Sequence, residues 1–216
     1  MMTNDRPTSR PGSLDLDNDL AVLRRFISSR RRVETERCDL CSAPVGKQHD
    51  HLVELTTRRI NCACPACALL FSGQESSKYK RVPRRTRLLA DFRITDAQWD
   101  ALLVPINLAF FFFSTRANKM VALYPSPAGP TESLLTLDSW EEIVNDNPVL
   151  KGLQADVEAL LVNRVGDTRE YYLAPIDECF RLVGLIRLHW RGLSGGVDVW
   201  KEIAAFFDAM KKNLAE

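Results

Sequence analysis

The chain has 216 residues, of which 45% are apolar and 26% charged, with a formal net charge of +1. This is the composition of an ordinary globular protein, and its charge gives no global reason to expect nucleic acid or an anionic membrane as partner. The longest apolar run, residues 101–113, is interrupted by Pro105 and Asn107 and is shorter than the roughly 20 residues that a membrane-spanning helix needs. The N-terminal segment lacks the apolar region of a signal peptide, so we expect a cytoplasmic protein.

The composition along the chain predicts four segments. Residues 1–15 are rich in proline, serine, asparagine and aspartate and are expected to be disordered. Apolar residues recur at helical spacing in residues 16–35, which predicts an amphipathic helix. A cysteine module is expected over residues 36–77, and an α+β domain over residues 78–216.

The cysteine module is the strongest chemical signal. Five of the six cysteines fall between residues 38 and 67, which in a reducing compartment indicates metal ligation before disulfides. Two Cys-x-x-Cys pairs predict one tetrahedral four-sulfur site, with the ligands Cys38, Cys41, Cys64 and Cys67. The spacing suits a zinc ribbon, in which each pair lies at the tip of a β-hairpin.

The identity of the metal stays open between zinc and iron. Zinc is the usual ion of a four-sulfur ribbon, whereas a rubredoxin-like iron site uses the same ligands. Rubredoxins place glycine after each cysteine pair, where this chain has Ser42 and Ala68, and their linker is longer. Both departures favour zinc.

Three further residues are alternate ligands. Cys62 lies two residues before Cys64 and could replace it or act as a reserve thiol near the metal. His49 and His51 lie between the cysteine pairs and could compete for the ion, although a histidine pair in a polar loop is more often solvated.

A basic stretch follows the module. Residues 78–93 contain seven lysines and arginines against one acid, Asp91. Arg84, Arg85 and Arg87 follow Pro83, which disfavours a continuous helix and leaves their guanidinium groups free to face outward. The stretch can be a nucleic-acid contact, a solvated face or a docking surface for an acidic protein, and the neutral total charge favours the last two.

The remaining segments predict a small, mainly antiparallel sheet and two C-terminal helices. Thr95 is expected to cap a short helix, and Pro125–Pro130 to form a rigid turn. In chain order we expect a helix from 95 to 103, then a strand over 108–114 that is buried on both faces, joined by a hairpin loop to a strand over 120–124. A helix around Trp140, a helix or strand over 157–165, a strand over 171–173, and helices over 175–192 and 195–214 follow.

The sequence contains no recognisable catalytic motif, so we expect no enzyme. His189 and Cys179 fall on a predicted helix, where packed residues are expected rather than a general base or a nucleophile.

Several motifs together resemble one known family. These are CxxC, CxCxxCxLLF (Cys62–Phe71), YKRVP (Tyr79–Pro83), YPSPAGxTES (Tyr124–Ser133) and PIDECFRLVGLIRLHWRGLSGG (Pro175–Gly196). They resemble a bacterial family whose function is uncharacterised and whose genes often lie in nickel–iron hydrogenase clusters. The resemblance implies a role in hydrogenase maturation, assembly or electron transfer. Because the shared motifs have no established chemistry, the resemblance identifies no catalytic residue in this chain.

Three functions remain as hypotheses. The first is a non-enzymatic zinc-binding auxiliary protein that binds a hydrogenase subunit or maturation factor. The second is a rubredoxin-like one-electron carrier with iron at the same cysteines. The third is a zinc-ribbon regulator that binds nucleic acid through the basic stretch.

Overall fold

The computed structural model describes most of the chain. The described residues are 36–72, 77–133, 138–192 and 195–214. The predicted disordered segment 1–15 and the predicted helix 16–35 lie outside them. From residue 36 onward the chain forms one compact unit.

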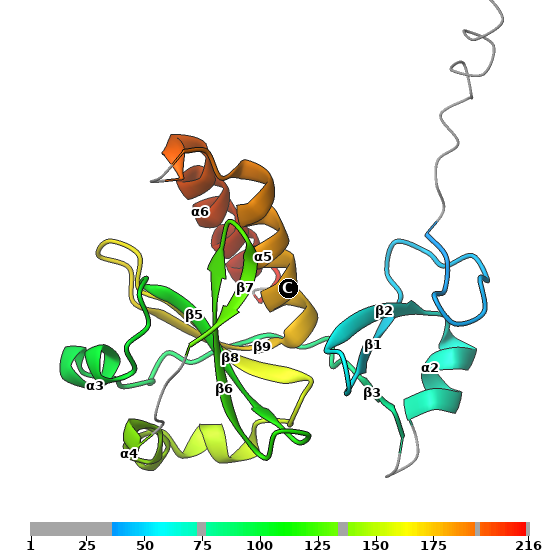
Figure 1. The fold of residues 1–216 in the computed structure, drawn as a ribbon, viewed down its shortest axis with the longest axis horizontal. Coiled ribbons are helices and arrows are strands. Elements are labelled where there is room, and N and C mark those ends of the chain that lie inside the picture. Colours follow the sequence, from blue (N-terminus) through cyan, green and yellow to red (C-terminus); the bar gives the residue numbers. More distant parts are fainter. Residues whose placement is uncertain (1–35, 73–76, 134–137, 193–194, 215–216) are drawn as a thin grey trace, which may run out of the picture. The chain divides into compact units, whose positions relative to one another are not determined.

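The described residues confirm an α+β fold with antiparallel sheets (Figure 1). Five α-helices and nine strands are assigned in them, and the strands form two separate sheets. None of the helices in this part of the chain has the length and hydropathy needed to cross a bilayer.

The cysteine module is built on a three-stranded sheet with the strand order β2-β1-β3. Its elements are β1 (Asp50–Glu54), β2 (Arg59–Ala63), β3 (Tyr79–Arg81) and the helix α2 (Pro65–Ser72). β1 and β2 form a hairpin in which Asp50 is opposite Ala63 and Glu54 is opposite Arg59. β3 pairs with the other edge of β1, so the basic stretch supplies a strand to this sheet.

The larger sheet has six strands in the order β4-β9-β8-β5-β6-β7, and all pairs are antiparallel. Its strands are β4 (Arg87–Leu88), β5 (Leu108–Ser114), β6 (Lys119–Ser126), β7 (Gly129–Glu132), β8 (Glu158–Asn163) and β9 (Glu170–Pro175). The associated helices are α3 (Asp96–Ala101), α4 (Asp138–Asp146), the 3-10 helix η1 (Pro148–Gly152), α5 (Ile176–His189) and α6 (Gly196–Lys212).

Both faces of the six-stranded sheet are buried. Side chains alternate between the faces of a strand, and in β5 Phe110 and Phe112 belong to the core that contains α5 and α6. Phe111 belongs to the second core, with Trp99 of α3 and Trp140 of α4. The aromatic run 108–114 is therefore a central strand between two helical layers, which confirms the prediction of a strand buried on both faces.

Local signals predicted the cap of α3 and the hairpin between β5 and β6 correctly, and the structure decides one segment that the sequence left open. Thr95 caps α3 in a reciprocal capping box with Gln98. The segment 115–118 joins β5 to β6 as a hairpin, with Ser114 opposite Lys119. The ambiguous run 157–165 is the strand β8, which is buried along its whole length.

The predicted rigid turn at residues 125–130 is wrong in extent. β6 continues to Ser126 and β7 begins at Gly129, so Pro125 lies opposite Pro130 in a strand pair. Proline lacks the N–H that a central strand needs, but Pro130 lies in the edge strand β7, and Pro125 lies beyond the part of β6 that pairs with β5, which ends at Leu123.

Asp156 connects the cysteine module to the larger sheet. Asp156 is 6% exposed, and its carboxylate lies 2.7 Å from Nζ of Lys80 in β3. The same carboxylate accepts hydrogen bonds from the N–H and the hydroxyl of Thr115, at 2.9 and 2.7 Å. Val53 and Val82 of the module are also buried in the core that contains α5 and α6. The two sheets therefore share both apolar packing and a buried polar contact.

We predict that Asp156→Ala lowers the free energy of unfolding by about 1–3 kcal/mol, because Lys80 and Thr115 lose a buried acceptor. Alanine is also strained at this position, whose φ of 69° is left-handed. Asp156→Asn keeps an acceptor and tolerates this backbone conformation, so its loss should be smaller. Urea unfolding followed by tryptophan fluorescence measures both, and equal stabilities of the alanine variant and the native chain would contradict this assignment.

Candidate metal centre

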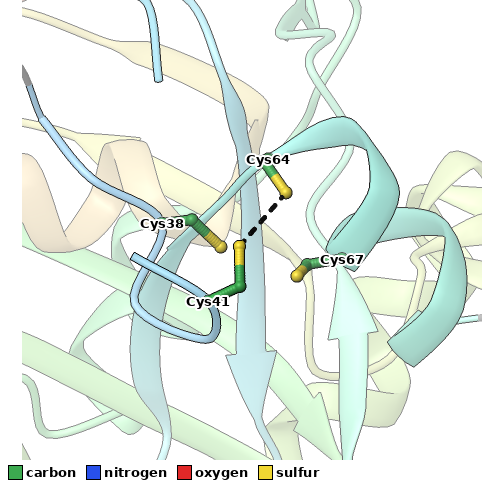
Figure 2. Close-up of side chains that lie close together, drawn as sticks. All are labelled: Cys38, Cys41, Cys64 and Cys67. Carbon is green, nitrogen blue, oxygen red and sulfur yellow. Dashed lines mark hydrogen bonds between the residues drawn. The ribbon is translucent and has the colours of Figure 1, made fainter. Parts of the chain in front are cut away.

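Four cysteine side chains converge at one end of the module. Cys38 and Cys41 come from the turn that precedes β1, whereas Cys64 follows β2 and Cys67 lies in the first turn of α2. All four sulfur atoms lie within 4.8 Å of one another, and those of Cys41 and Cys64 are 3.7 Å apart. Figure 2 shows the four sulfurs directed toward one another. The four ligands predicted from the sequence are therefore brought together.

The first cysteine pair lies on a tight turn closed by its own backbone. The N–H of Ser42 donates to the carbonyl of Cys38 at 2.8 Å, and the N–H of Cys38 donates to the carbonyl of Ala43 at 2.8 Å. Ser42 has a φ of 60°, in the left-handed region that favours glycine. Serine therefore occupies a position whose backbone conformation favours glycine, the residue that rubredoxins place there.

The second cysteine pair does not lie at the tip of a hairpin, contrary to the zinc-ribbon expectation. Cys64 stands where β2 ends and α2 begins, and its carbonyl accepts the first helical hydrogen bond from Ala68 at 2.9 Å. Pro65 occupies the first helical position, where its missing N–H costs nothing. Cys64 and Cys67 are three residues apart and lie on one side of the helix start. A strand–helix junction thus supplies this half of the site.

The backbone around the site stabilises negative charge on one sulfur in particular. Burial raises the pKa of the Cys38 thiol, but N–H groups directed at its sulfur outweigh burial and lower the pKa to about 6. These N–H groups belong to Cys64, Leu40 and Cys41. Burial, hydrogen bonds from the other thiols and the charge on Cys38 raise the pKa of Cys67 to about 12. A negative charge on the sulfur of Cys38 therefore makes ionisation of the Cys67 thiol less favourable. A divalent cation between the sulfurs would offset this repulsion.

The distances match a tetrahedral metal site and not a disulfide. Bonds of about 2.3 Å from zinc to sulfur place tetrahedral ligands about 3.8 Å apart, close to the 3.7 Å between Cys41 and Cys64. A disulfide would hold its sulfurs at about 2.05 Å, and all six cysteines are free. The four clustered cysteines can hold one metal ion, and they fill all four positions of a tetrahedron.

The three alternate ligands form a group of their own. His49, His51 and Cys62 each offer one ligand atom within 4.8 Å of the others, and none belongs to the tetracysteine group. The histidines are not solvated in a loop as the sequence suggested. The side chain of His49 is only 6% exposed, and His51 lies in β1. A hydrogen bond to Asp177 raises the pKa of His51.

The predicted partner-binding arginines differ in their surroundings. Arg84 is not free, because it lies 2.9 Å from the carboxylate of Asp50, which is 5% exposed and also pairs with Arg81. Burial raises the pKa of Asp50, but the two guanidinium groups outweigh burial and hold it below its usual value. Among the described residues, Arg85 and Arg87 form no ion pair, and both are exposed.

Sequence reasoning missed Asp177 as part of a candidate site. Asp177 lies in the first turn of α5, and its Oδ2 lies 2.6 Å from Nδ1 of His51. The two residues are 126 positions apart, so neither local spacing nor periodicity connects them.

We predict that Cys38→Ser, Cys41→Ser and Cys67→Ser each weaken metal binding at the four-sulfur site by more than roughly a hundredfold. Loss of a residue that only hydrogen-bonds to a ligand typically costs about 10–100-fold in affinity, and loss of the ligand itself should cost more. Titration with Co²⁺, which gives strong sulfur-to-metal absorption at a four-thiolate site, measures this. Cys62→Ser is the control and should keep the four-thiolate spectrum. If Cys62→Ser abolished that spectrum while Cys64→Ser kept it, the ligand assignment would be wrong.

Comparison with known proteins identifies a family without an assigned activity. The family of unknown function DUF5947 matches residues 37–214, which include both sheets and all the site residues described above. No curated protein and no solved structure matches the chain. The match confirms the resemblance to a family of uncharacterised function. The chain belongs to the DUF5947 family.

Proposed function

We propose that the protein is a cytoplasmic, non-enzymatic auxiliary protein of a nickel–iron hydrogenase, and that a zinc ion at the tetracysteine site fixes a surface for a protein partner. The observation that carries this proposal is the position of α2. Its N-terminal end supplies Cys64 and Cys67 to the site, and the residues that follow expose large apolar side chains.

The donor set supports a structural role for the metal. Catalytic zinc keeps one position for water or substrate, whereas structural zinc takes four protein ligands. Four cysteines complete the tetrahedron here. In addition, two of the ligands, Cys38 and Cys67, are part of the small buried core of the module. The ion would therefore stabilise the fold of the module and the orientation of α2.

The exposed face of α2 supports a protein partner. Leu69 is 76% exposed, Leu70 is 69% exposed and Phe71 is 43% exposed, and the three are consecutive. Contiguous exposed apolar residues are typical of protein-binding sites. The hydrogenase itself enters the proposal through the family resemblance described above.

The charge pairing of the basic stretch favours protein over nucleic acid. Lys78 pairs with Glu54, and Lys80 with Asp156. Arg81 and Arg84 share Asp50. Cations that are already neutralised release no counterions on binding a phosphate backbone, which is the main source of non-specific affinity for nucleic acids.

A rubredoxin-like electron carrier is the second candidate. The observation in its favour is the exposure of Cys41, which would place one ligand of an iron ion at the surface, where an electron can be exchanged. Metal analysis separates the two functions. Freshly purified protein should be colourless and contain zinc, whereas red protein with iron at the four cysteines would identify the carrier.

We predict that the double variant Leu69→Asp/Leu70→Asp weakens binding to the client, which is the hydrogenase subunit or maturation factor that the protein binds, about tenfold or more. A few apolar side chains that become buried on binding contribute most of the free energy of an interface. The tagged full-length chain is tested against purified hydrogenase subunits and their maturation factors by surface biosensor. Leu188→Asp is the matched control, since Leu188 of α5 is 72% exposed. The four-thiolate Co²⁺ spectrum should be unchanged in both variants.

Two results would overturn the proposal. The first is a native chain that binds no hydrogenase subunit or maturation factor. The second is binding that Leu69→Asp/Leu70→Asp and Leu188→Asp reduce equally, which would remove α2 from the interface.

Arg85 and Arg87 give a further prediction about the same interface. Charges at the rim of an interface mainly set the association rate and its salt dependence. Arg85→Glu/Arg87→Glu should therefore slow association with the client at low salt, and the difference from the native chain should shrink as salt rises. Lys47→Glu, which changes another exposed cation of the module, is the control. Equal association rates for the two variants would show that residues 85 and 87 are an ordinary solvated surface.

A further inference from the structure

The cysteine module holds a second group of metal-ligating side chains, formed by His49, His51 and Cys62. His51 of β1 lies directly opposite Cys62 of β2 in the hairpin. Residues opposite each other in an antiparallel pair project to the same face, and His49 stands two residues before His51. One ligand atom from each of the three lies within 4.8 Å of the others.

The hydrogen bonds of the two imidazoles determine which nitrogens are available. Nδ1 of His49 lies 2.8 Å from the carbonyl oxygen of Gly46, and Nδ1 of His51 lies 2.6 Å from Oδ2 of Asp177. Both partners are hydrogen-bond acceptors, so each Nδ1 carries the hydrogen. In the neutral imidazoles, each Nε2 therefore presents a lone pair.

These two lone pairs lie close together. Nε2 of His49 and Nε2 of His51 are 3.1 Å apart, and the ring planes are perpendicular. Two neutral acceptors at this distance repel unless a proton or a metal cation lies between them. Zinc–nitrogen bonds of about 2.0–2.1 Å in a tetrahedral site place two nitrogens about 3.3 Å apart, which is close to the distance observed.

We propose that His49 Nε2, His51 Nε2 and Cys62 Sγ form a second metal site that binds a divalent first-row transition-metal ion such as Zn²⁺. Two imidazoles and one thiolate are donors that such ions accept. Metal-ligating histidines commonly donate their other N–H to a carboxylate or a backbone carbonyl, which fixes the ring and raises its basicity. Asp177 and the Gly46 carbonyl occupy these two outer positions.

The second site differs from the tetracysteine site in its openness. Three protein ligands leave a fourth position for water or an added ligand. His49 and His51 lie in the wall of a cavity of about 630 Å³, whose lining also includes Arg85, Asp177 and Arg181. The bound ion can therefore exchange more readily than one enclosed by four cysteines.

This inference is independent of the hydrogenase proposal, because it uses no feature of α2 and no assumed partner. It also assigns a role to Cys62, which the tetracysteine site does not use.

The test is a Co²⁺ and Zn²⁺ titration of the full-length chain after complete removal of metal. The native protein should bind two equivalents, of which one gives a four-thiolate spectrum and the other a weaker, nitrogen-rich spectrum. Cys62→Ser and His49→Gln should each lose the second equivalent and keep the first. Cys41→Ser should lose the four-thiolate spectrum and keep the other. His189→Gln, which changes the third histidine of the chain, is the control and should bind two equivalents.

Asp177 is expected to act as a positioning residue for this ion. Asp177→Asn should lower the affinity for the second metal ion by about 10–100-fold and leave the affinity for the first unchanged, because residues that hydrogen-bond to a metal ligand contribute this much. Glu178→Gln is the matched control, since Glu178 also lies in the first turn of α5 but pairs with Arg181. A general loss of stability would lower the affinity for both ions, whereas loss of a residue that positions His51 lowers the affinity for the second ion alone.

A single equivalent in the native chain would overturn the second site. So would a second equivalent that Cys62→Ser and His49→Gln leave intact. Either result would assign the short contact between the imidazoles to a shared proton in place of a metal.

Discussion

The convergence of four sulfur atoms is the constraint on which the cysteine module depends. Its own buried core contains five residues, and two of them, Cys38 and Cys67, are sulfur ligands. A core of this size is too small to stabilise a fold unaided, and structural metals commonly supply the missing free energy. The turn at Ser42, the β1–β2 hairpin and the start of α2 all have the geometry that brings the sulfurs together. Without an ion, thiolates held this close would repel one another.

The module is nevertheless not an independent appendage. Val53 and Val82 extend the core that contains α5 and α6, and Asp156 connects Lys80 to the end of β5. His51 reaches Asp177 at the start of α5. The module and α5 are therefore linked by side chains in direct contact. This coupling distinguishes the protein from a metal module joined by a flexible linker.

Electrostatics organises the same region. Asp50 is buried beside two arginines, and the unpaired charge would be costly without them. The basic stretch, which looks like a surface for anions in the sequence, is thus largely part of the fold. The module also exposes large apolar side chains, at Leu69 and Leu70 of α2. A partner is therefore expected to recognise shape and apolar surface, with Arg85 and Arg87 contributing at the edge.

The sequence by itself determined the features that depend on short spacings. The four cysteines, the helix cap at Thr95 and the doubly buried strand at residues 108–114 all follow from patterns within a few residues. The tertiary structure added that Cys62 belongs to a different group, because Cys62 lies within β2 whereas Cys64 follows the end of that strand. Only the tertiary structure brought Asp177 to His51, since that contact joins residues 126 positions apart. Spacing along the chain carries information about the local backbone, whereas contacts between distant segments depend on how sheets and helices pack.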